Sequence, residues 1–334
     1  MGGVSFLRVS LKQIPRLRLV FATLALLAAV APAAAQYPQR PVTIVVPFPA
    51  GGATDLIARV LANELHEKLG QPFVVESRPG AGTTLAATAV ARAAPDGATL
   101  LLATTSTLAI APSVYKALAY DPLKDFAPVE LVGTTDFVLI GDPALAADDV
   151  PGLIKLLRAK AGAMTYASAG IGTPHHLIMA MFLREAGATA QHVPYRGSPL
   201  ALTDIVAGRV PMMMCDLTAA LPLIRAGKLK AFGVATATRS PQAPDIATIG
   251  EAGLPGFAAS GWFSIVAPAG TPRATIDTLN RVMTGYLARP EAAEKLAAAA
   301  MRPLTSTPEE LARFIVSERS KWAEVAAAAG IEPQ

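Results

Sequence analysis

Short apolar runs alternate with stretches of helical periodicity along most of the chain. Val42–Val46 is an unbroken β-branched run, as expected of a strand buried on both faces of a sheet. Gly51-Gly52 follows it, and apolar residues then recur every three or four positions over residues 54–69. The same alternation predicts further strands at residues 73–76, 99–103, 137–140, 165–168, 191–193, 210–214 and 230–235, with helices between most of them. The pattern is typical of βαβ units and predicts an α/β protein.

The C-terminal third has a different pattern. Residues 241–261 are rich in proline and glycine, and one more strand is expected at residues 263–267. One helix is expected from Thr271. A second helix should begin at Thr307-Pro308-Glu309-Glu310, which supplies an N-cap residue, an N1 proline and an N3 glutamate. Two strong helices after a late strand indicate that the chain returns to pack on its first part.

These elements predict two α/β lobes that the chain crosses between twice, near residues 136–140 and 258–263. We expect a discontinuous first lobe at residues 36–138 and 261–334, and a second lobe at residues 139–260. In sheets of this kind, the loops after parallel strands share one edge, where ligands bind. The sequence therefore predicts a binding site at the strand ends.

The N-terminus has the features of a secretory signal peptide. Basic side chains precede an apolar stretch at residues 19–30, and Ala33-Ala34-Ala35 follows it. That stretch is shorter than the ~20 residues of a membrane-spanning helix. We predict a signal peptide at residues 1–35, cleaved after Ala35, and secretion into the periplasm.

The net charge indicates little about binding partners once the signal peptide is removed. The chain has 334 residues, with 29 Lys+Arg against 25 Asp+Glu, which by itself would suggest nucleic acid or a membrane surface as a partner. Four of the basic residues and none of the acidic ones lie in residues 1–35, so the remaining 299 residues carry 25 of each sign. We therefore expect no nucleic-acid partner. The single cysteine, Cys215, excludes an internal disulfide framework.

Two segments of the first lobe could carry binding chemistry. Residues 48–55, which read Phe-Pro-Ala-Gly-Gly-Ala-Thr-Asp, join a strand to a helix N-terminus, where amides and glycines suit an anion. They match neither the Walker loop nor the dinucleotide fingerprint, and a plain capped turn is the alternative. Four hydroxyl residues at 104–107 follow a buried strand. Of these, Thr105 and Ser106 are predicted to donate to a ligand carboxylate, the alternative being a solvated turn.

Three segments of the second lobe are comparable. Residues 168–176 form a glycine-rich strand end with adjacent histidines, which face different sides of a helix and so do not suit one metal. Tyr195-Arg196-Gly197-Ser198 follows the next strand, although Arg196 could equally be a surface charge. Asp216 either accepts from a ligand or caps a helix. We expect no metal site.

Together these segments resemble the Bug-type receptors, the solute-binding proteins of the tripartite tricarboxylate transporters. The likeness extends over residues 37–331, from the opening strand and the loop at residues 48–55 onward. Further matching motifs are Glu76-Ser77-Arg78-Pro79-Gly80-Ala81-Gly82, Ala94-Pro95-Asp96-Gly97, Tyr120-Asp121-Pro122, His192-Val193-Pro194-Tyr195-Arg196-Gly197, Ala226-Gly227-Lys228-Leu229 and Ala267-Pro268-Ala269-Gly270-Thr271-Pro272.

The resemblance implies a two-lobed type II periplasmic binding protein fold that closes on a small organic carboxylate in a cleft between the lobes. It implies no catalysis, no cofactor, a monomer, and membrane transporter subunits as partners. Carried over to this chain, the ligand-binding positions are Phe48, Ala50, Gly51, Gly52, Thr54 and Asp55 in the first lobe, and Ser168, Gly170, Thr173, His176, Tyr195, Gly197 and Asp216 in the second.

Two other functions are compatible with the sequence. A closed pair of lobes could signal to a membrane histidine kinase without serving transport. A secreted hydrolase would use Ser106, Ser168 or Cys215 as nucleophile and His176 as base, but no nucleophile motif supports it. Aromatic acids, dicarboxylates, amino acids and nicotinate-like acids all remain open as ligands.

Overall fold

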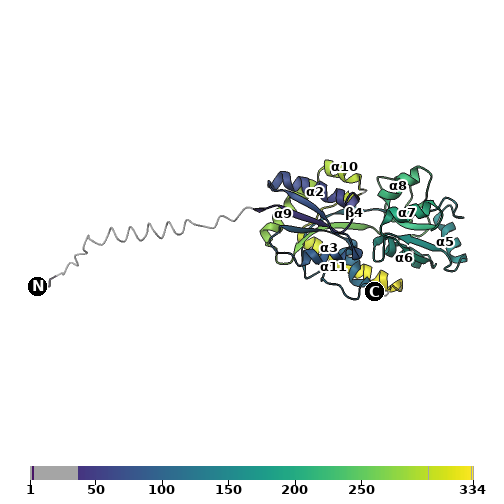
Figure 1. Ribbon diagram of the computed structural model, residues 1–334, viewed down its shortest axis with the longest axis horizontal. Coiled ribbons are helices and arrows are strands. Elements are labelled where there is room, and N and C mark those ends of the chain that lie inside the picture. Colours follow the sequence, from purple (N-terminus) through teal and green to yellow (C-terminus); the bar gives the residue numbers. More distant parts are fainter. Residues whose placement is uncertain (1, 4–36, 300, 332, 334) are drawn as a thin grey trace.

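The computed structural model of the protein has two α/β lobes, each built around its own sheet (Figure 1). It describes residues 2–3, 37–299, 301–331 and 333. Apart from residues 2–3, the predicted signal peptide at residues 1–35 lies outside the described residues. In the part that is described, no helix is both long and apolar enough to span a bilayer. The predicted α/β architecture is confirmed.

The first sheet has six strands, which are β1 (Val42–Val46), β2 (Phe73–Ser77), β3 (Thr99–Thr104), β4 (Phe126–Thr135), β10 (Gly261–Pro268) and β11 (Met301–Pro303). Their order is β11-β4-β10-β3-β1-β2. β1 is parallel to β2 and β3, whereas β10 is antiparallel to β3 and β4. The helical elements of this lobe are α2 (Ala53–Leu69), η2 (Ala81–Thr83), α3 (Thr84–Ala91), the π-helical turn η3 (Ser106–Ile110), α4 (Ala111–Val114), α9 (Arg273–Leu287), α10 (Pro290–Ala297) and α11 (Pro308–Ala328).

The second sheet has five strands, which are β5 (Phe137–Gly141), β6 (Thr165–Ser168), β7 (Gln191–Pro194), β8 (Met212–Asp216) and β9 (Lys230–Val234). Their order is β7-β6-β8-β5-β9, with β6 parallel to β7 and β8, and β5 antiparallel to β8 and β9. The helices around it are α5 (Val150–Ala159), α6 (Pro174–Glu185), α7 (Ser198–Val206) and α8 (Leu217–Arg225). The boundaries at residues 138 and 261 stay a prediction.

Both connections between the lobes run past the strand ends that carry the loops of interest. The chain passes from β4 to β5 through Asp136, and the first residue of β5, Phe137, pairs with Asp216 at the end of β8. It returns into β10, where Phe263 pairs with Thr104 at the end of β3. β5 and β10 are antiparallel to these neighbours because each enters its sheet from the other lobe. The crossings therefore bring the loop edges of the two sheets face to face.

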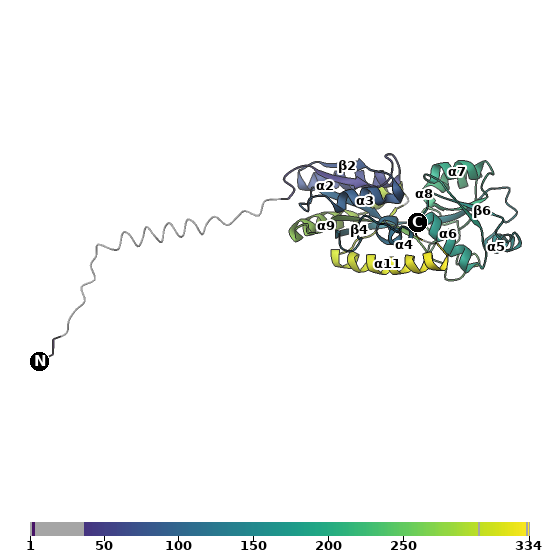
Figure 2. The same cartoon turned by 60° about the horizontal axis from the view of Figure 1, so that its bottom comes forward.

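Helix α11 packs against both lobes. It runs along the first lobe and ends beside α6 of the second (Figure 2). One cluster of buried apolar side chains contains Leu108 of η3, Phe182 of α6 and Trp322 of α11. Glu318 of α11 accepts hydrogen bonds from the indoles of Trp262 and Trp322, at 2.8 and 2.9 Å. The C-terminal helix is thus joined to β10, which lines the region between the lobes.

Strand β4 was not among the predicted strands, because Pro128 and a buried charge interrupt its apolar pattern. Glu130 is fully buried, and burial raises its pKa to about 7 although its hydrogen bonds act in the opposite direction. The Ser306 amide and the Asn280 side chain donate to its carboxyl oxygens at 2.7 and 2.8 Å. These partners lie far along the chain, so no local pattern indicates that a glutamate fits inside this sheet.

Candidate functional site

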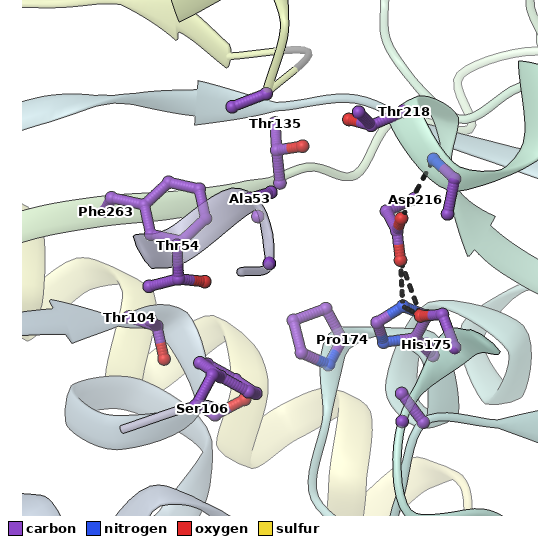
Figure 3. A pocket seen from close by; sticks show the side chains of 18 of the residues that line it. Ala53, Thr54, Thr104, Ser106, Thr135, Pro174, His175, Asp216, Thr218 and Phe263 are labelled. Carbon is purple, nitrogen blue, oxygen red and sulfur yellow. Dashed lines mark hydrogen bonds and ion pairs between the residues drawn. The ribbon is translucent and has the colours of Figure 1, made fainter. Parts of the chain in front are cut away.

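A cavity of about 530 Å³ lies between the lobes at the facing loop edges (Figure 3). Its first-lobe walls come from the loop after β1, the hydroxyl residues after β3, and the ends of β4 and β10. Its second-lobe walls come from the loops after β6, β7 and β8. Among the lining residues Arg196 and Asp216 carry full charges, and Arg196 is exposed. The cavity therefore has no strongly basic wall.

The loop after β1 presents the N-terminus of α2 to this cavity. Gly51 adopts a left-handed backbone at φ +83°, which glycine tolerates without strain. Gly52 is the N-cap of α2, and no side chain caps the helix. The N–H groups of the first turn have no acceptor within a helix, and they carry the positive end of its dipole. Gly52, Ala53 and Thr54 line the cavity, so this end is a ready anion site.

Asp55 braces that loop and is not among the lining residues. Its Oδ2 accepts from the Gly51 amide at 3.1 Å and from Arg59 at 2.8 Å. The hydrogen bond from Arg59 lowers the pKa of Asp55, against the effect of its burial. The carboxylate thus holds the shape of the loop.

The hydroxyl residues after β3 form a second wall. Thr104, Thr105 and Ser106 line the cavity. The Trp262 amide donates to Thr105 Oγ1 at 2.8 Å, which ties this segment to the crossing strand β10. Thr107 faces inward instead and donates to Thr83 Oγ1 at 3.1 Å. Two of these hydroxyl residues, Thr105 and Ser106, were selected from the sequence, and Thr104 was not.

Three helices of the second lobe also begin at the cavity. Pro174 and His175 at the start of α6, Gly197 and Ser198 at the start of α7, and Thr218 and Ala219 at the start of α8 all line it. With α2, four helix N-termini border one cavity. Asp216 caps α8, whereas α2, α6 and α7 have no side-chain cap, so the dipoles of these three helices favour negative charge there.

His175, Ser198 and Asp216 form a polar cluster in this wall (Figure 3). His175 Nε2 lies 2.8 Å from Asp216 Oδ1 and 3.0 Å from Ser198 Oγ. The Ser198 hydroxyl donates to the same Oδ1 at 2.7 Å, and the Ala219 amide donates to Oδ2 at 3.2 Å. Burial alone would raise the pKa of Asp216, but the His175, Ser198 and Ala219 hydrogen bonds outweigh it and the pKa is lowered.

This cluster does not have the geometry of a hydrolase triad. In a triad the imidazole holds the acid through one nitrogen and the serine through the other. Here His175 contacts both Asp216 and Ser198 through Nε2, and the serine hydroxyl donates to the carboxylate. Cys215 is fully buried, and its burial raises the thiol pKa well above its ordinary value. Neither arrangement activates a nucleophile.

His176 lies on the other side of α6, inside the lobe. Its ring stacks on His192 with centroids 3.9 Å apart, and His192 stacks in turn on Tyr166. Desolvation lowers the pKa of His176 to about 3 and that of His192 to about 4. Ser168 Oγ lies 2.6 Å from His192 Nε2. These residues pack behind the loop after β6 and do not line the cavity.

The remaining predicted residues of the second lobe hold loops in place. Gly170 accepts from the Thr173 hydroxyl at 2.7 Å, and its own amide donates to Ser168 Oγ at 3.1 Å. The Tyr195 hydroxyl donates to Asp204 at 2.7 Å. None of Ser168, Gly170, Thr173 and Tyr195 is among the residues that line the cavity.

The structure thus brings nine of the fifteen predicted residues to one cavity: Phe48, Ala50, Gly51, Gly52, Thr54, Thr105, Ser106, Gly197 and Asp216. The other six, Asp55, Ser168, Gly170, Thr173, His176 and Tyr195, lie outside its lining. Lining residues that the sequence did not single out for binding include Thr135, Phe137, Thr218, Trp262 and Phe263. Of these, Phe137, Trp262 and Phe263 carried a signal, because the chain was expected to cross between the lobes near residues 136–140 and 258–263. Among residues 37–299, 301–331 and 333, no group of three His, Cys, Asp or Glu side chains could hold a metal ion.

Comparison with known proteins identifies the family. The model of the tripartite tricarboxylate transporter family receptor matches residues 57–331. The chain belongs to this receptor family. Protein BugT of Bordetella pertussis is 39% identical to this receptor over 290 residues, which cover 86% of this chain and 89% of BugT. The resemblance inferred from the motifs is confirmed.

Solved structures place the receptor among two-lobed periplasmic binding proteins. An R. palustris protein determined with adipate is 35% identical, with a TM-score of 0.84 over 89% of this chain and all of that one. The periplasmic binding protein BugD is also 35% identical, with a TM-score of 0.80 and the same coverage. The predicted two-lobed fold of this receptor is therefore confirmed.

Proposed function

We propose that this receptor captures a small organic carboxylate in the cavity between its lobes and delivers it to a tripartite tricarboxylate-type transporter in the membrane. It acts in the periplasm, after removal of the predicted signal peptide, and performs no catalysis on its ligand. The observation that carries the proposal is the meeting of three uncapped helix N-termini, those of α2, α6 and α7, at one cavity of about 530 Å³.

The electrostatics of the cavity support a carboxylate. A carboxylate that leaves water needs fixed hydrogen-bond donors in its place. The first-turn amides of α2 and the Ser106 hydroxyl can supply them from the first lobe, whereas the Thr105 hydroxyl already donates to the Trp262 carbonyl. The adipate in the R. palustris relative is a carboxylate of this kind. A cavity lined from both lobes also links binding to closure, because a ligand that contacts both lobes favours the closed form.

A thermal-shift screen of the purified mature protein against organic acids tests the binding step. The panel spans aromatic acids, dicarboxylates, amino acids and nicotinate-like acids. An acid present at about 100 times its Kd should add roughly 2.7 kcal/mol to the free energy of unfolding. If no acid raises the melting temperature at millimolar concentration, the proposed ligand class is wrong.

Delivery to a transporter is tested by uptake of the same acid into cells that have or lack this receptor. Uptake should depend on the receptor at low acid concentration. Unchanged uptake, together with tight binding in vitro, would contradict the transport role and favour signalling instead.

A further inference from the structure

The polar side chains in the second-lobe wall of the cavity are already bonded to one another. The Ser198 hydroxyl and the Ala219 amide both donate to the Asp216 carboxylate. His175 Nε2 lies 2.8 Å from the same carboxylate. His175 Nδ1 and Thr218 Oγ1 have no partner among the described residues, but both atoms are buried, so a ligand in the cavity cannot reach them. These side chains therefore leave no free donor for a second carboxylate.

This wall also carries a negative charge of its own. Burial would raise the pKa of Asp216, but the hydrogen bonds just described lower it, so the carboxyl is ionised near neutral pH. Its side chain is 25% exposed, and it lines the cavity. A second ligand carboxylate would stand beside this like charge, and the repulsion grows when closure excludes water. Arg196 is the basic residue of the lining, but its side chain is exposed, where an ion pair contributes little.

The helix N-termini of this wall do not change that balance. Asp216 already supplies the negative charge that α6 and α7 favour, because His175 and Ser198 in their first turns contact it. Pro174 and Pro199 also lie in these first turns, and a proline has no N–H to donate. The second lobe is therefore a poorer site for a ligand carboxylate than α2.

The rest of the cavity wall is mostly apolar. Figure 3 shows the Phe263 ring on the first-lobe side and the Pro174 ring on the second-lobe side. Phe137, Ala169 and Pro199 add further apolar surface. A ligand body that covers these side chains removes apolar surface from water, which favours binding. The volume of about 530 Å³ lies within the ~300–1,000 Å³ of small-molecule sites and leaves room for such a body.

We propose that the receptor selects carboxylic acids with a single charged end and an apolar body, aliphatic or aromatic. The carboxylate binds at the α2 end, and the apolar body extends toward the second lobe. This inference rests on the proposed function, because it assumes that the carboxylate binds at α2. Asp216 is the specificity-determining residue, since its charge excludes a second carboxylate from the far end.

Calorimetric titration with acids that differ at the far end tests the inference. The flexible set is hexanoate, 6-hydroxyhexanoate and adipate, and the rigid pair is benzoate and terephthalate. Hexanoate should bind at least tenfold more tightly than adipate and at least threefold more tightly than 6-hydroxyhexanoate. Benzoate should likewise bind at least tenfold more tightly than terephthalate. These comparisons use the wild-type protein and do not depend on the folding of any variant.

Asp216→Asn keeps a side chain that can cap α8 but removes the charge. It should bring the Kd of adipate within threefold of that of hexanoate. Asp204→Asn is the matched control, because Asp204 is a carboxylate of the same lobe outside the cavity lining, and it should leave the tenfold ratio unchanged.

Two results would overturn the inference while leaving the carboxylate receptor intact. One is a wild-type protein that binds adipate as tightly as hexanoate, and the other is an Asp216→Asn variant that keeps the wild-type ratio. Failure of every acid, these and the wider thermal-shift panel alike, to bind would overturn the proposed function as well.

Discussion

The stacked pair His176 and His192 should make the protein sensitive to acid. Both rings are neutral in the folded protein, because desolvation lowers their pKa values to about 3 and about 4 from an ordinary value of 6.5. The His176 residue is only 7% exposed, and its ring lies 3.9 Å from that of His192. A proton on either ring would lie in a dry site beside the other ring.

The direction in which stability changes with pH follows from proton uptake. Below about pH 6.5 the unfolded chain binds protons on these histidines and the folded chain does not, so stability falls as the pH falls toward 4. Above pH 6.5 both states are neutral and the effect vanishes. One pH unit corresponds to about 1.4 kcal/mol for each group, so each histidine should remove about 2 kcal/mol at pH 5, and the pair about 4 kcal/mol.

Urea unfolding at pH 7.5 and pH 5.0 measures this effect. The wild type is compared with His176→Phe/His192→Gln, in which Phe keeps a stacking ring and Gln can still bond Ser168. Carboxylates contribute equally to both proteins and cancel in the comparison. The wild type should lose about 4 kcal/mol more than the variant between the two pH values. A difference below about 1 kcal/mol would show that the pair is not held neutral by burial and would refute the reasoning.

Two further changes test the loop and the link to α11. Gly52→Leu should raise the Kd for the bound acid at least 100-fold, equivalent to about 2.7 kcal/mol, while the fold is kept. Binding should weaken because Gly52 lines the cavity, where a leucine side chain would take up space. The fold should be kept because Gly52 has a negative φ of −85° and an added Cβ would meet only Pro49 O, at 3.7 Å. Gly285→Leu on the exposed face of α9 is the control, and equal affinity in both variants would contradict the assignment. Glu318→Ala should lower the free energy of unfolding by about 2–6 kcal/mol, because it leaves two buried indole N–H groups without an acceptor. Urea unfolding followed by tryptophan fluorescence measures this loss. Glu318→Gln, which keeps a carbonyl acceptor, should cost less, and a loss below about 1 kcal/mol in Glu318→Ala would disprove the link.

Local signals predicted much of the fold. The capping box at Thr307 is present, since the Thr307 side chain accepts from the Glu310 amide and the Glu310 side chain accepts from the Thr307 amide. Its chemistry lies within four consecutive residues, which is why the sequence reveals it. Strand β4 was missed because the groups that make Glu130 tolerable, Asn280 and Ser306, come from distant parts of the chain.

The residues of the candidate site also divide into those with a local sequence signal and those placed by contacts distant in the chain. The glycine loop of the first lobe could be located, because a strand, two glycines and a helix start are adjacent in sequence. Which of the two histidines on α6 faces the cavity depends on how that helix packs on β8 and α11, which no local pattern records. The structure places His175 in the lining and His176 in the stack. Thr135 and Trp262 join the cavity only because the crossing strands pass it.

We expect the ligand carboxylate to bind at the N-terminus of α2, between the lobes. The most direct measurement is a crystal structure of the mature protein with the acid that gives the largest thermal shift. We expect the carboxylate oxygens to lie within hydrogen-bond distance, about 2.7–3.2 Å, of the Ala53 or Thr54 amide or of an ordered water bound to them. An acid bound elsewhere, or one in this cavity with its carboxylate turned away from α2, would contradict it.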